Sequence, residues 1–453
     1  MAKHKETRWE GDRNIMKRNL LICALVGILS VGIVFASCTQ TSSTPATPTT
    51  STTPTTPTTP ATPATPTTEE AIEIPFGTCS CLSGPYAPWG LSEHWAQEIM
   101  VDDINNGGGC WGDIYGHEPG FRVDGQLYKW KLIAYDYKMD SAEAVKVVNR
   151  LVYEDGVKFM HVFCWPALYP TRDILEQNKI FVSEQGMGED IIGPEYPRTF
   201  RFLQEPNTNA AALVPYMYDT LGYRTVSIIG DDTADGVVYS DEYGKWMEQV
   251  GIEVLSKQIY EPNTQDYTPF LSKAIAENPD LIAGLKVDAP LMGMFVKQAR
   301  ELGYEGDIFM GAPFTWKELV ETCGDMENIE GLLSTMMIGE ECPLERQQWF
   351  RDEYIARHGE SEWDGGIVDR ADPIHMITIA IEKANSLDPD EVAAALENLE
   401  SPDLKSFYGD PCWFGGESVW GINHDLVTPA SLIKVVDGHP ITLATITPPR
   451  DAY

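Results

Sequence analysis

Short apolar runs alternate with amphipathic stretches along most of the chain. Residues 131–135, 159–163 and 180–183 are short and apolar, and each predicts a buried strand. Between the first two runs, apolar side chains recur at the spacing of one helix face: Ala144, Val145, Val148, Leu151 and Val152. A second helix is predicted near residues 172–177.

A second series of the same kind follows. Residues 225–229, 280–283 and 307–310 predict strands, and a helix is expected from about 290 to 302. Strands that alternate with helices indicate a parallel sheet, because parallel neighbours need a crossover connection. The pattern therefore predicts an α/β fold with two doubly wound parallel-sheet lobes. A ligand site is expected beyond the carboxyl ends of the strands.

Length and charge narrow the class of protein. The chain has 453 residues, which is long for one domain of about 100–200 residues. With 68 acidic and 33 basic side chains its formal net charge is -35. Nucleic-acid binding needs clustered Lys and Arg, so we expect no nucleic acid as a partner.

The first residues predict export rather than a folded element. Lys17 and Arg18 precede an apolar stretch, residues 20–36, as in a secretory signal. The sequence Phe-Ala-Ser-Cys that ends at Cys38 resembles a bacterial lipoprotein box, with Phe35 in place of the usual Leu. This resemblance implies a signal peptide at 1–37 and a lipid on Cys38. An uncleaved membrane anchor is the alternative, and Met16 is a second candidate start.

Residues 38–71 are mostly Thr, Pro, Ser and Ala. Proline removes backbone donors and fixes φ, so we expect an extended tether at about 3.1 Å per residue.

Seven cysteines remain beyond Cys38, and an odd number leaves at least one thiol unpaired or intermolecular. Disulfides are permitted outside the cell. Two pairings stay open, Cys323 with Cys342 and Cys81 with Cys110. Cys79 and Cys81 have no second cluster at metal spacing, so we expect no metal site. The seven are Cys79, Cys81, Cys110, Cys164, Cys323, Cys342 and Cys412.

Two further patterns were weighed as metal sites. Residues 231–242 carry acids at calcium-loop positions, but the β-branched run 225–229 before them predicts a strand where that motif requires a helix. His375 lies within an apolar helical stretch and is expected to be a helix-face residue rather than a ligand.

The order of several segments resembles a known family. Residues 83–90 follow the first strand, and the next helix carries Ala96, Met100 and Ile104 on one stripe. Other segments match in order and spacing: 103–108, 121–130, 298–303 and 329–333. Over about 72–447 the chain resembles the type I periplasmic binding proteins of the branched-chain amino-acid (Leu/Ile/Val) class, solute receptors of ABC importers. Residues 110–120 depart from that family and are expected to decorate a lobe rim.

The resemblance implies two lobes joined by a three-segment hinge. We expect one lobe at 72–203 plus 337–424 and the other at 204–336 plus 425–447. The chain would cross between them near 201–204, 335–337 and 421–426.

The resemblance also implies which residues touch the ligand. They come from loops after the strands of both lobes: Trp89, Trp165, Ala167, Gln185, Met187, Asp235 and Asp288. The hydroxyls that hold the carboxylate of an amino acid are largely replaced by indoles, a thioether and acids. Such a pocket favours a hydrophobic or aromatic solute over a zwitterionic amino acid. The alternatives are that Trp165 and Met187 pack behind the pocket and that the two acids are solvated.

We therefore expect an extracytoplasmic lipoprotein anchored through Cys38 to the outer face of the cytoplasmic membrane. It would deliver a small amino-acid-like, hydrophobic or aromatic solute to ABC permease subunits with cytoplasmic ATPases. It would be a monomer, without cofactor, and not an enzyme. A sensor ectodomain of similar fold and a surface hydrolase are the alternatives.

Overall fold

The computed structural model describes residues 70–186, 190–287, 291–311, 316–335 and 337–450. The predicted signal peptide, Cys38 and nearly all of the tether lie outside these ranges. Within the described ranges, no helix combines the length and the apolar character needed to cross a membrane.

The first lobe is built on an eight-stranded sheet in the order β12-β13-β6-β5-β4-β1-β3-β2. Its central strands are parallel, and β2 and β12 pair antiparallel at the two edges. The strands are β1 (Ile72–Ser80), β2 (Phe121–Val123), β3 (Gln126–Asp136), β4 (Phe159–Val162), β5 (Phe181–Glu184), β6 (Thr199–Arg201), β12 (Trp413–Gly415) and β13 (Asp425–Val427).

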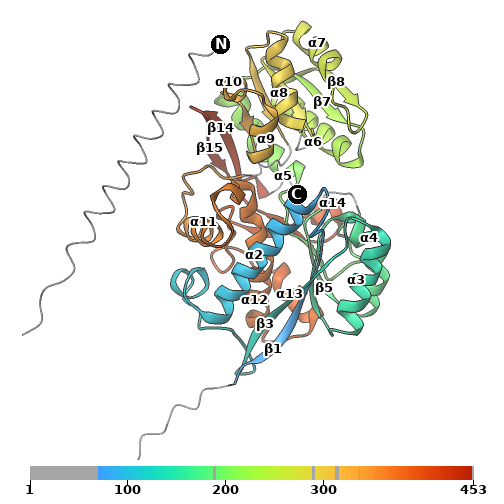
Figure 1. Ribbon diagram of the computed structural model, residues 1–453, viewed down its shortest axis with the longest axis vertical. Helices are drawn as coiled ribbons and strands as arrows, with labels where there is room; N and C mark the ends of the chain where they lie inside the picture. The colour runs from blue at the N-terminus through green and yellow to red at the C-terminus, as the bar shows by residue number, and fades with distance from the viewer. Residues whose placement is uncertain (1–69, 187–189, 288–290, 312–315, 336, 451–453) are drawn as a thin grey trace, which may run out of the picture. The chain divides into compact units, whose positions relative to one another are not determined.

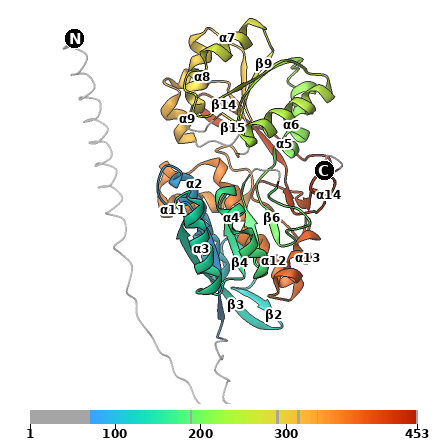
Figure 2. The same ribbon diagram turned by 90° about the vertical axis from the view of Figure 1, so that its right-hand side faces the viewer.

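Helices cover both faces of this sheet, as Figures 1 and 2 show. One face packs against α3 and α4 and the other against α2, α12 and α13, so two separate apolar clusters form. The helices are α2 (Ala87–Asn106), α3 (Ser141–Tyr153), α4 (Trp165–Gln177), α11 (Glu345–His358), α12 (Asp372–Ala384), α13 (Pro389–Glu397) and α14 (Glu417–Trp420).

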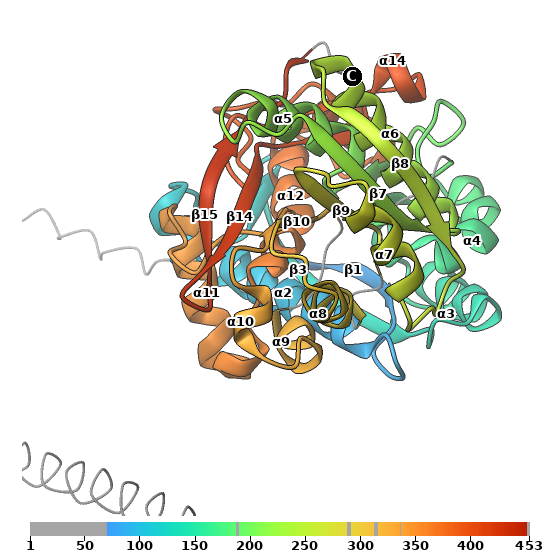
Figure 3. The same ribbon diagram turned by 90° about the horizontal axis from the view of Figure 1, so that it is seen from above.

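The second lobe is built on a seven-stranded sheet in the order β15-β14-β11-β10-β9-β7-β8, which Figure 3 shows from above. The strands are β7 (Thr225–Asp231), β8 (Glu253–Tyr260), β9 (Leu281–Leu285), β10 (Asp307–Met310), β11 (Leu333–Ser334), β14 (Ala430–Val436) and β15 (His439–Ile446). The helices are α5 (Pro206–Asp219), α6 (Ala234–Val250), α7 (Thr268–Ala276), α8 (Met292–Glu301), α9 (Trp316–Thr322) and α10 (Met326–Ile329).

The chain passes between the two sheets three times: after β6, after β11 and between β13 and β14. At two of these crossings the Gln204 side chain donates to Thr428 Oγ1 and to the Pro429 carbonyl, both at 2.7 Å. The α/β class with two doubly wound lobes and a three-segment hinge is thus confirmed. The exact lobe boundaries remain a proposal, and β13 lies in the first sheet although residues 425–427 were expected in the second lobe.

Two helices differ in detail from their predicted form. In α3 the buried stripe includes Val147, and Val145 is only half-buried, because the sheet covers a slightly rotated face. Helix α4 begins at Trp165 rather than near 172. It starts there although Pro166 and Pro170 follow, and Pro166 is tolerated because a first-turn N–H has no helical partner.

The prediction that the segment 110–120 decorates a lobe rim is wrong. Its first half forms a short π-helix, Cys110–Ile114, and the Trp111 side chain is fully buried. The Asp103 carboxylate accepts the Trp111 N–H at 2.7 Å, and the indole N–H reaches the Glu118 and Gly120 carbonyls at 2.9 and 3.1 Å. Trp111 therefore anchors the segment in the first-lobe core, although Asp113, Gly116, Glu118 and Pro119 are exposed.

All seven described cysteines carry free thiols, so neither pairing left open by the sequence forms. No disulfide forms because the two cysteines of each pair lie in different apolar clusters. Cys323 packs in the second lobe and Cys342 in the first. Cys81 packs against α3, while Cys110 packs near α11.

Residues 231–242 form the end of β7 and the start of α6, so the predicted strand before them is confirmed. Thr233 caps this helix, and its hydroxyl accepts the Gly236 N–H at 3.0 Å. His375 lies on α12 and is fully buried, as expected for a helix residue.

Candidate functional site

In the first lobe, predicted site residues lie just beyond the carboxyl ends of parallel strands. Trp89 is in the first turn of α2, which follows β1. Trp165 opens α4 after β4, and Gln185 directly follows β5. Ala167 is fully buried within α4. Parallel strands deliver their following loops to one edge of the sheet, which is why these positions gather there.

The start of α4 offers few donors to an anionic group. Its N-cap, Cys164, has φ 68° and makes no side-chain cap hydrogen bond. Pro166 has no N–H. Trp165 instead leaves 45% of its surface exposed, with the Tyr169 ring at 6.2 Å between centroids. This helix start therefore presents aromatic surface where a helix often binds a carboxylate.

In the second lobe, Asp235 lies in the first turn of α6 after β7. Burial raises the pKa of Asp235, and the Lys286 ammonium opposes that shift. The pKa of the Cys164 thiol is raised well above its usual value by burial and further by Glu184 and Asp235.

Arg370 lies beside the predicted site residue Trp89, and the sequence reasoning did not include it. It belongs to the 3-10 helix Gly365–Ala371, and its guanidinium lies 5.4 Å from the centroid of the Trp89 ring. The cap of that helix, Asp364, accepts the backbone N–H of Trp316 from the second lobe. In sequence, Arg370 is one basic residue among acids, and no motif marks it.

Arg172 is a second missed residue, on α4. Its guanidinium lies 3.8 Å from the Tyr196 ring centroid and 5.0 Å from that of Tyr169. The three guanidinium nitrogens are buried and make no hydrogen bond. Arg172, Asp190 and Glu195 are among the residues that line a cavity of about 360 Å³.

A buried polar network lies beneath these strand ends. The Ser80 hydroxyl donates to Glu93 Oε2 at 2.8 Å, and the other Glu93 oxygen pairs with His161 Nε2. His161 Nδ1 contacts the Ser183 hydroxyl at 2.9 Å. All four side chains are fully buried, so they connect the central strands of the sheet without reaching solvent.

Two predicted residues, Met187 and Asp288, lie outside the described residues. The ligand-binding roles of Trp89, Trp165, Ala167, Gln185 and Asp235 remain predictions. Across the residues that the structure describes, no group of three His, Cys, Asp or Glu side chains is placed to hold a metal ion.

Glu184 predicts a pH dependence of stability. Burial raises its pKa from 4.5 to about 8, although it accepts the Gly186 N–H at 2.6 Å. A carboxyl with a raised folded-state pKa stabilises the fold fully below pH 4.5, and this contribution is lost as pH rises towards 8. Between pH 5 and pH 8 the wild type should therefore lose roughly 3 kcal/mol of stability that Glu184→Gln, which has no titrating carboxyl at this position, should keep.

Urea unfolding at both pH values measures this difference. The control is Glu154→Gln, because the Glu154 side chain is 73% exposed and should leave the pH slope unchanged. An unaltered slope in Glu184→Gln would contradict the prediction.

Comparison with known proteins identifies the family to which this fold belongs. A model of the periplasmic binding protein family matches residues 73–440. A leucine-, isoleucine-, valine-, threonine-, and alanine-binding protein of Pseudomonas aeruginosa is 25% identical over 347 residues, which cover 72% of this chain and 86% of that protein.

Solved structures share the fold. The leucine-binding protein LivK of Thermotoga maritima has a TM-score of 0.66 at 20% identity, over 83% of this chain and 99% of that chain. A Rhodopseudomonas palustris solute-binding protein in complex with 3,4-dihydroxybenzoic acid has a TM-score of 0.64 at 20% identity, over 84% and 98%. Since the family model spans most of the chain, the chain belongs to the periplasmic binding protein family.

Proposed function

We propose that the protein is a lipid-anchored, extracytoplasmic receptor that takes a hydrophobic or aromatic solute and delivers it to the permease of an ABC importer. Membership of the family supports the receptor role and the transporter as a partner. The anchor rests on the basic residues Lys17 and Arg18, the apolar stretch 20–36 and Cys38. The Thr- and Pro-rich tether would hold the lobes away from the membrane surface.

The proposed ligand class rests on the residues at the start of α4. A zwitterionic amino acid needs donors for its carboxylate, and here Pro166 and Ala167 supply neither a hydroxyl nor, at Pro166, an N–H. Trp165 offers an exposed indole in their place. A planar apolar group stacked on an indole gains about 0.5–1.5 kcal/mol beyond its area burial.

The Trp89–Arg370 stack supports the same ligand class. The guanidinium lies over one face of the Trp89 ring, which holds that ring in place. A rigid indole provides contact area at little cost in side-chain entropy. Among the structural neighbours, the Rhodopseudomonas palustris protein was solved with an aromatic acid and the Streptococcus pneumoniae protein with isoleucine. The fold therefore accommodates both classes, and the side chains must discriminate.

Isothermal titration calorimetry of the full-length lipoprotein in detergent tests the proposal. We expect 4-hydroxybenzoate or 3,4-dihydroxybenzoate to bind at least ten times more tightly than leucine, isoleucine or valine. Trp165→Ala should weaken the aromatic ligand about tenfold, and Trp165→Phe should retain most of the affinity because it keeps a ring. Micromolar binding of leucine or valine, unaffected by Trp165→Ala, would contradict the ligand class.

A further inference from the structure

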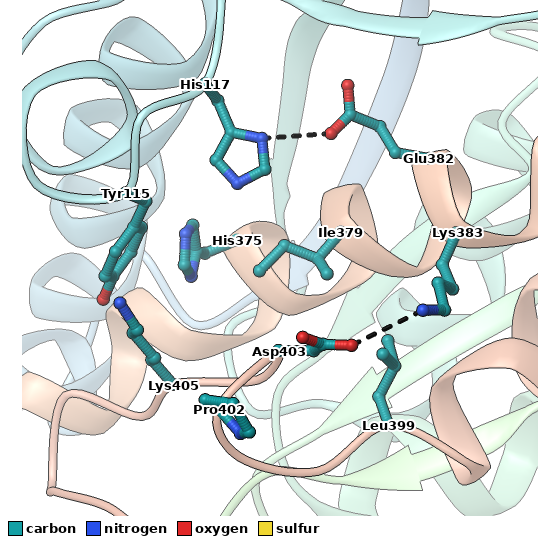
Figure 4. Close-up of a pocket in the computed structure, with 10 residues that line it drawn as sticks. All are labelled: Tyr115, His117, His375, Ile379, Glu382, Lys383, Leu399, Pro402, Asp403 and Lys405. Atoms are coloured by element: carbon teal, nitrogen blue, oxygen red, sulfur yellow. Dashed lines mark hydrogen bonds and ion pairs between the residues drawn. The ribbon is translucent and has the colours of Figure 1, made fainter.

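A cavity of about 420 Å³ opens in the first lobe, where α12 meets the segments 115–117 and 399–405 (Figure 4). None of its lining residues belongs to the second lobe. It also contains none of the residues assigned to the solute site above. A volume of this size is within the range of small-molecule sites, which is about 300–1,000 Å³.

His375 forms part of the wall and is polar without being satisfied. It is fully buried, and neither ring nitrogen has a hydrogen-bond partner. The Tyr115 ring stacks on it at 4.5 Å between centroids, and Trp111 meets its edge at 5.4 Å. A buried unsatisfied polar atom costs about 1–3 kcal/mol. Such a group in a cavity wall indicates a missing partner, because most buried polar atoms are bonded.

Among the described charged side chains around the cavity, one cation has no ion-pair partner. His117 pairs with Glu382 at 3.2 Å, and Lys383 pairs with Asp403 at 3.4 Å. The Lys405 ammonium instead lies 4.8 Å from the Tyr115 ring centroid and, among the residues the structure describes, forms no ion pair.

The remaining wall is apolar. Ile379, Leu399 and Pro402 line the cavity between the Lys405 end and the Lys383–Asp403 pair, as Figure 4 shows. A ligand with one anionic group and an apolar body would match both parts of the wall. A dianion would fit less well, because Glu382 and Asp403 lie on the rim.

We propose that this cavity is a second ligand site, which binds a small apolar monocarboxylate through Lys405 and His375. The carboxylate would pair with the Lys405 ammonium and accept the His375 N–H, and the apolar body would lie against Ile379 and Leu399. Tyr115 and His117 come from the segment 110–120, and the other lining residues come from α12 and from residues 399–405. The predicted solute site beyond the carboxyl ends of the strands, with Trp89, Trp165 and Gln185, is called the strand-end site below. The proposal for the second cavity does not depend on the solute class proposed for that site.

The experiment uses 4-fluorobenzoate as the probe and ¹⁹F NMR of the full-length lipoprotein in detergent as the readout. We expect saturable binding that weakens at least tenfold in Lys405→Met and recovers in Lys405→Arg. The matched control is Lys131→Met, which removes an exposed lysine elsewhere in the lobe and should leave the affinity unchanged. Thermal unfolding of each variant verifies that the fold is retained.

A second set of measurements separates this cavity from the strand-end site. Binding that persists in Trp165→Ala supports the proposal, and 4-fluorobenzyl alcohol should bind at least ten times more weakly because it lacks the charge. The proposal is overturned if the probe does not bind, if Lys405→Met leaves its affinity unchanged, or if Trp165→Ala alone abolishes binding.

Discussion

Arg201→Met is expected to lower the free energy of unfolding by about 3–5 kcal/mol, because it removes the guanidinium that pairs with the buried Asp425 carboxylate. Arg201 donates to both Asp425 oxygens, at 2.9 and 2.6 Å. The two side chains are 1% and 0% exposed. This pair joins β6 to β13 next to two of the three crossings between the lobes.

The charge of Arg201 also acts on its neighbours. Glu184 and Glu205 are fully buried carboxyls whose pKa values burial raises, and Arg201 lowers both. Loss of the guanidinium should therefore raise both pKa values further. It also removes the cation from the Trp420 ring, whose centroid lies 5.0 Å away.

Urea unfolding at pH 7 measures the effect, and the double variant Arg201→Met/Asp425→Leu is the matched control. Replacing both members of a buried ion pair by apolar residues is often near neutral, so the double variant should be more stable than Arg201→Met alone. If the two variants are equally unstable, the penalty does not come from breaking the Arg201–Asp425 ion pair.

Trp111→Ala is the second change with a large expected effect, a loss of about 3–5 kcal/mol. The indole is fully buried among residues of α2, β3 and α12. Alanine would leave a cavity and remove the N–H that reaches the Glu118 and Gly120 carbonyls. His117, which stacks on Trp111 at 4.0 Å between centroids, would lose its support as well.

The same substitution at Trp165 provides the control for Trp111→Ala. Trp165 is 45% exposed, so Trp165→Ala should cost less than about 1 kcal/mol in the absence of ligand. Thermal and urea unfolding of both variants give the comparison. Comparable losses in the two variants would mean that the segment 110–120 does not anchor the first-lobe core.

The stability measurements on the Arg201 and Trp111 variants would show how the first lobe supports the predicted solute site. The strand ends that position Trp89, Trp165 and Gln185 lie above a buried network of Glu93, His161 and the serines. A rigid sheet edge fixes where the loops begin, and the loops then determine what is bound. Variation in the ligand would accordingly arise in the loops and leave this network intact.

Most of the strands and helices could be predicted from the sequence, because periodicity is a local property of the chain. The α3 stripe and the runs that became β4, β7 and β10 are examples. The failures occurred where contacts between distant segments decide. Trp111 was expected on a rim, and only the approach of α12 makes it a core residue.

The residues of the candidate site likewise fall into those that could be predicted from the sequence and those that only the structure revealed. The family resemblance singled out Trp89, Trp165 and Gln185, and they lie at one edge of a sheet because parallel strands all end on the same side. It could not place Arg370 on Trp89 or leave Lys405 unpaired beside a cavity, because those partners come from distant parts of the chain.

The sequence by itself therefore determined the fold class, and it predicts an export signal and the sheet edge at which a solute would bind. Each of these follows from a pattern within a short stretch or from the order of elements. Only the tertiary structure decided which charges are paired, which thiols stay apart and where a second cavity opens. Those outcomes depend on distances between residues far apart along the chain, which no local pattern encodes.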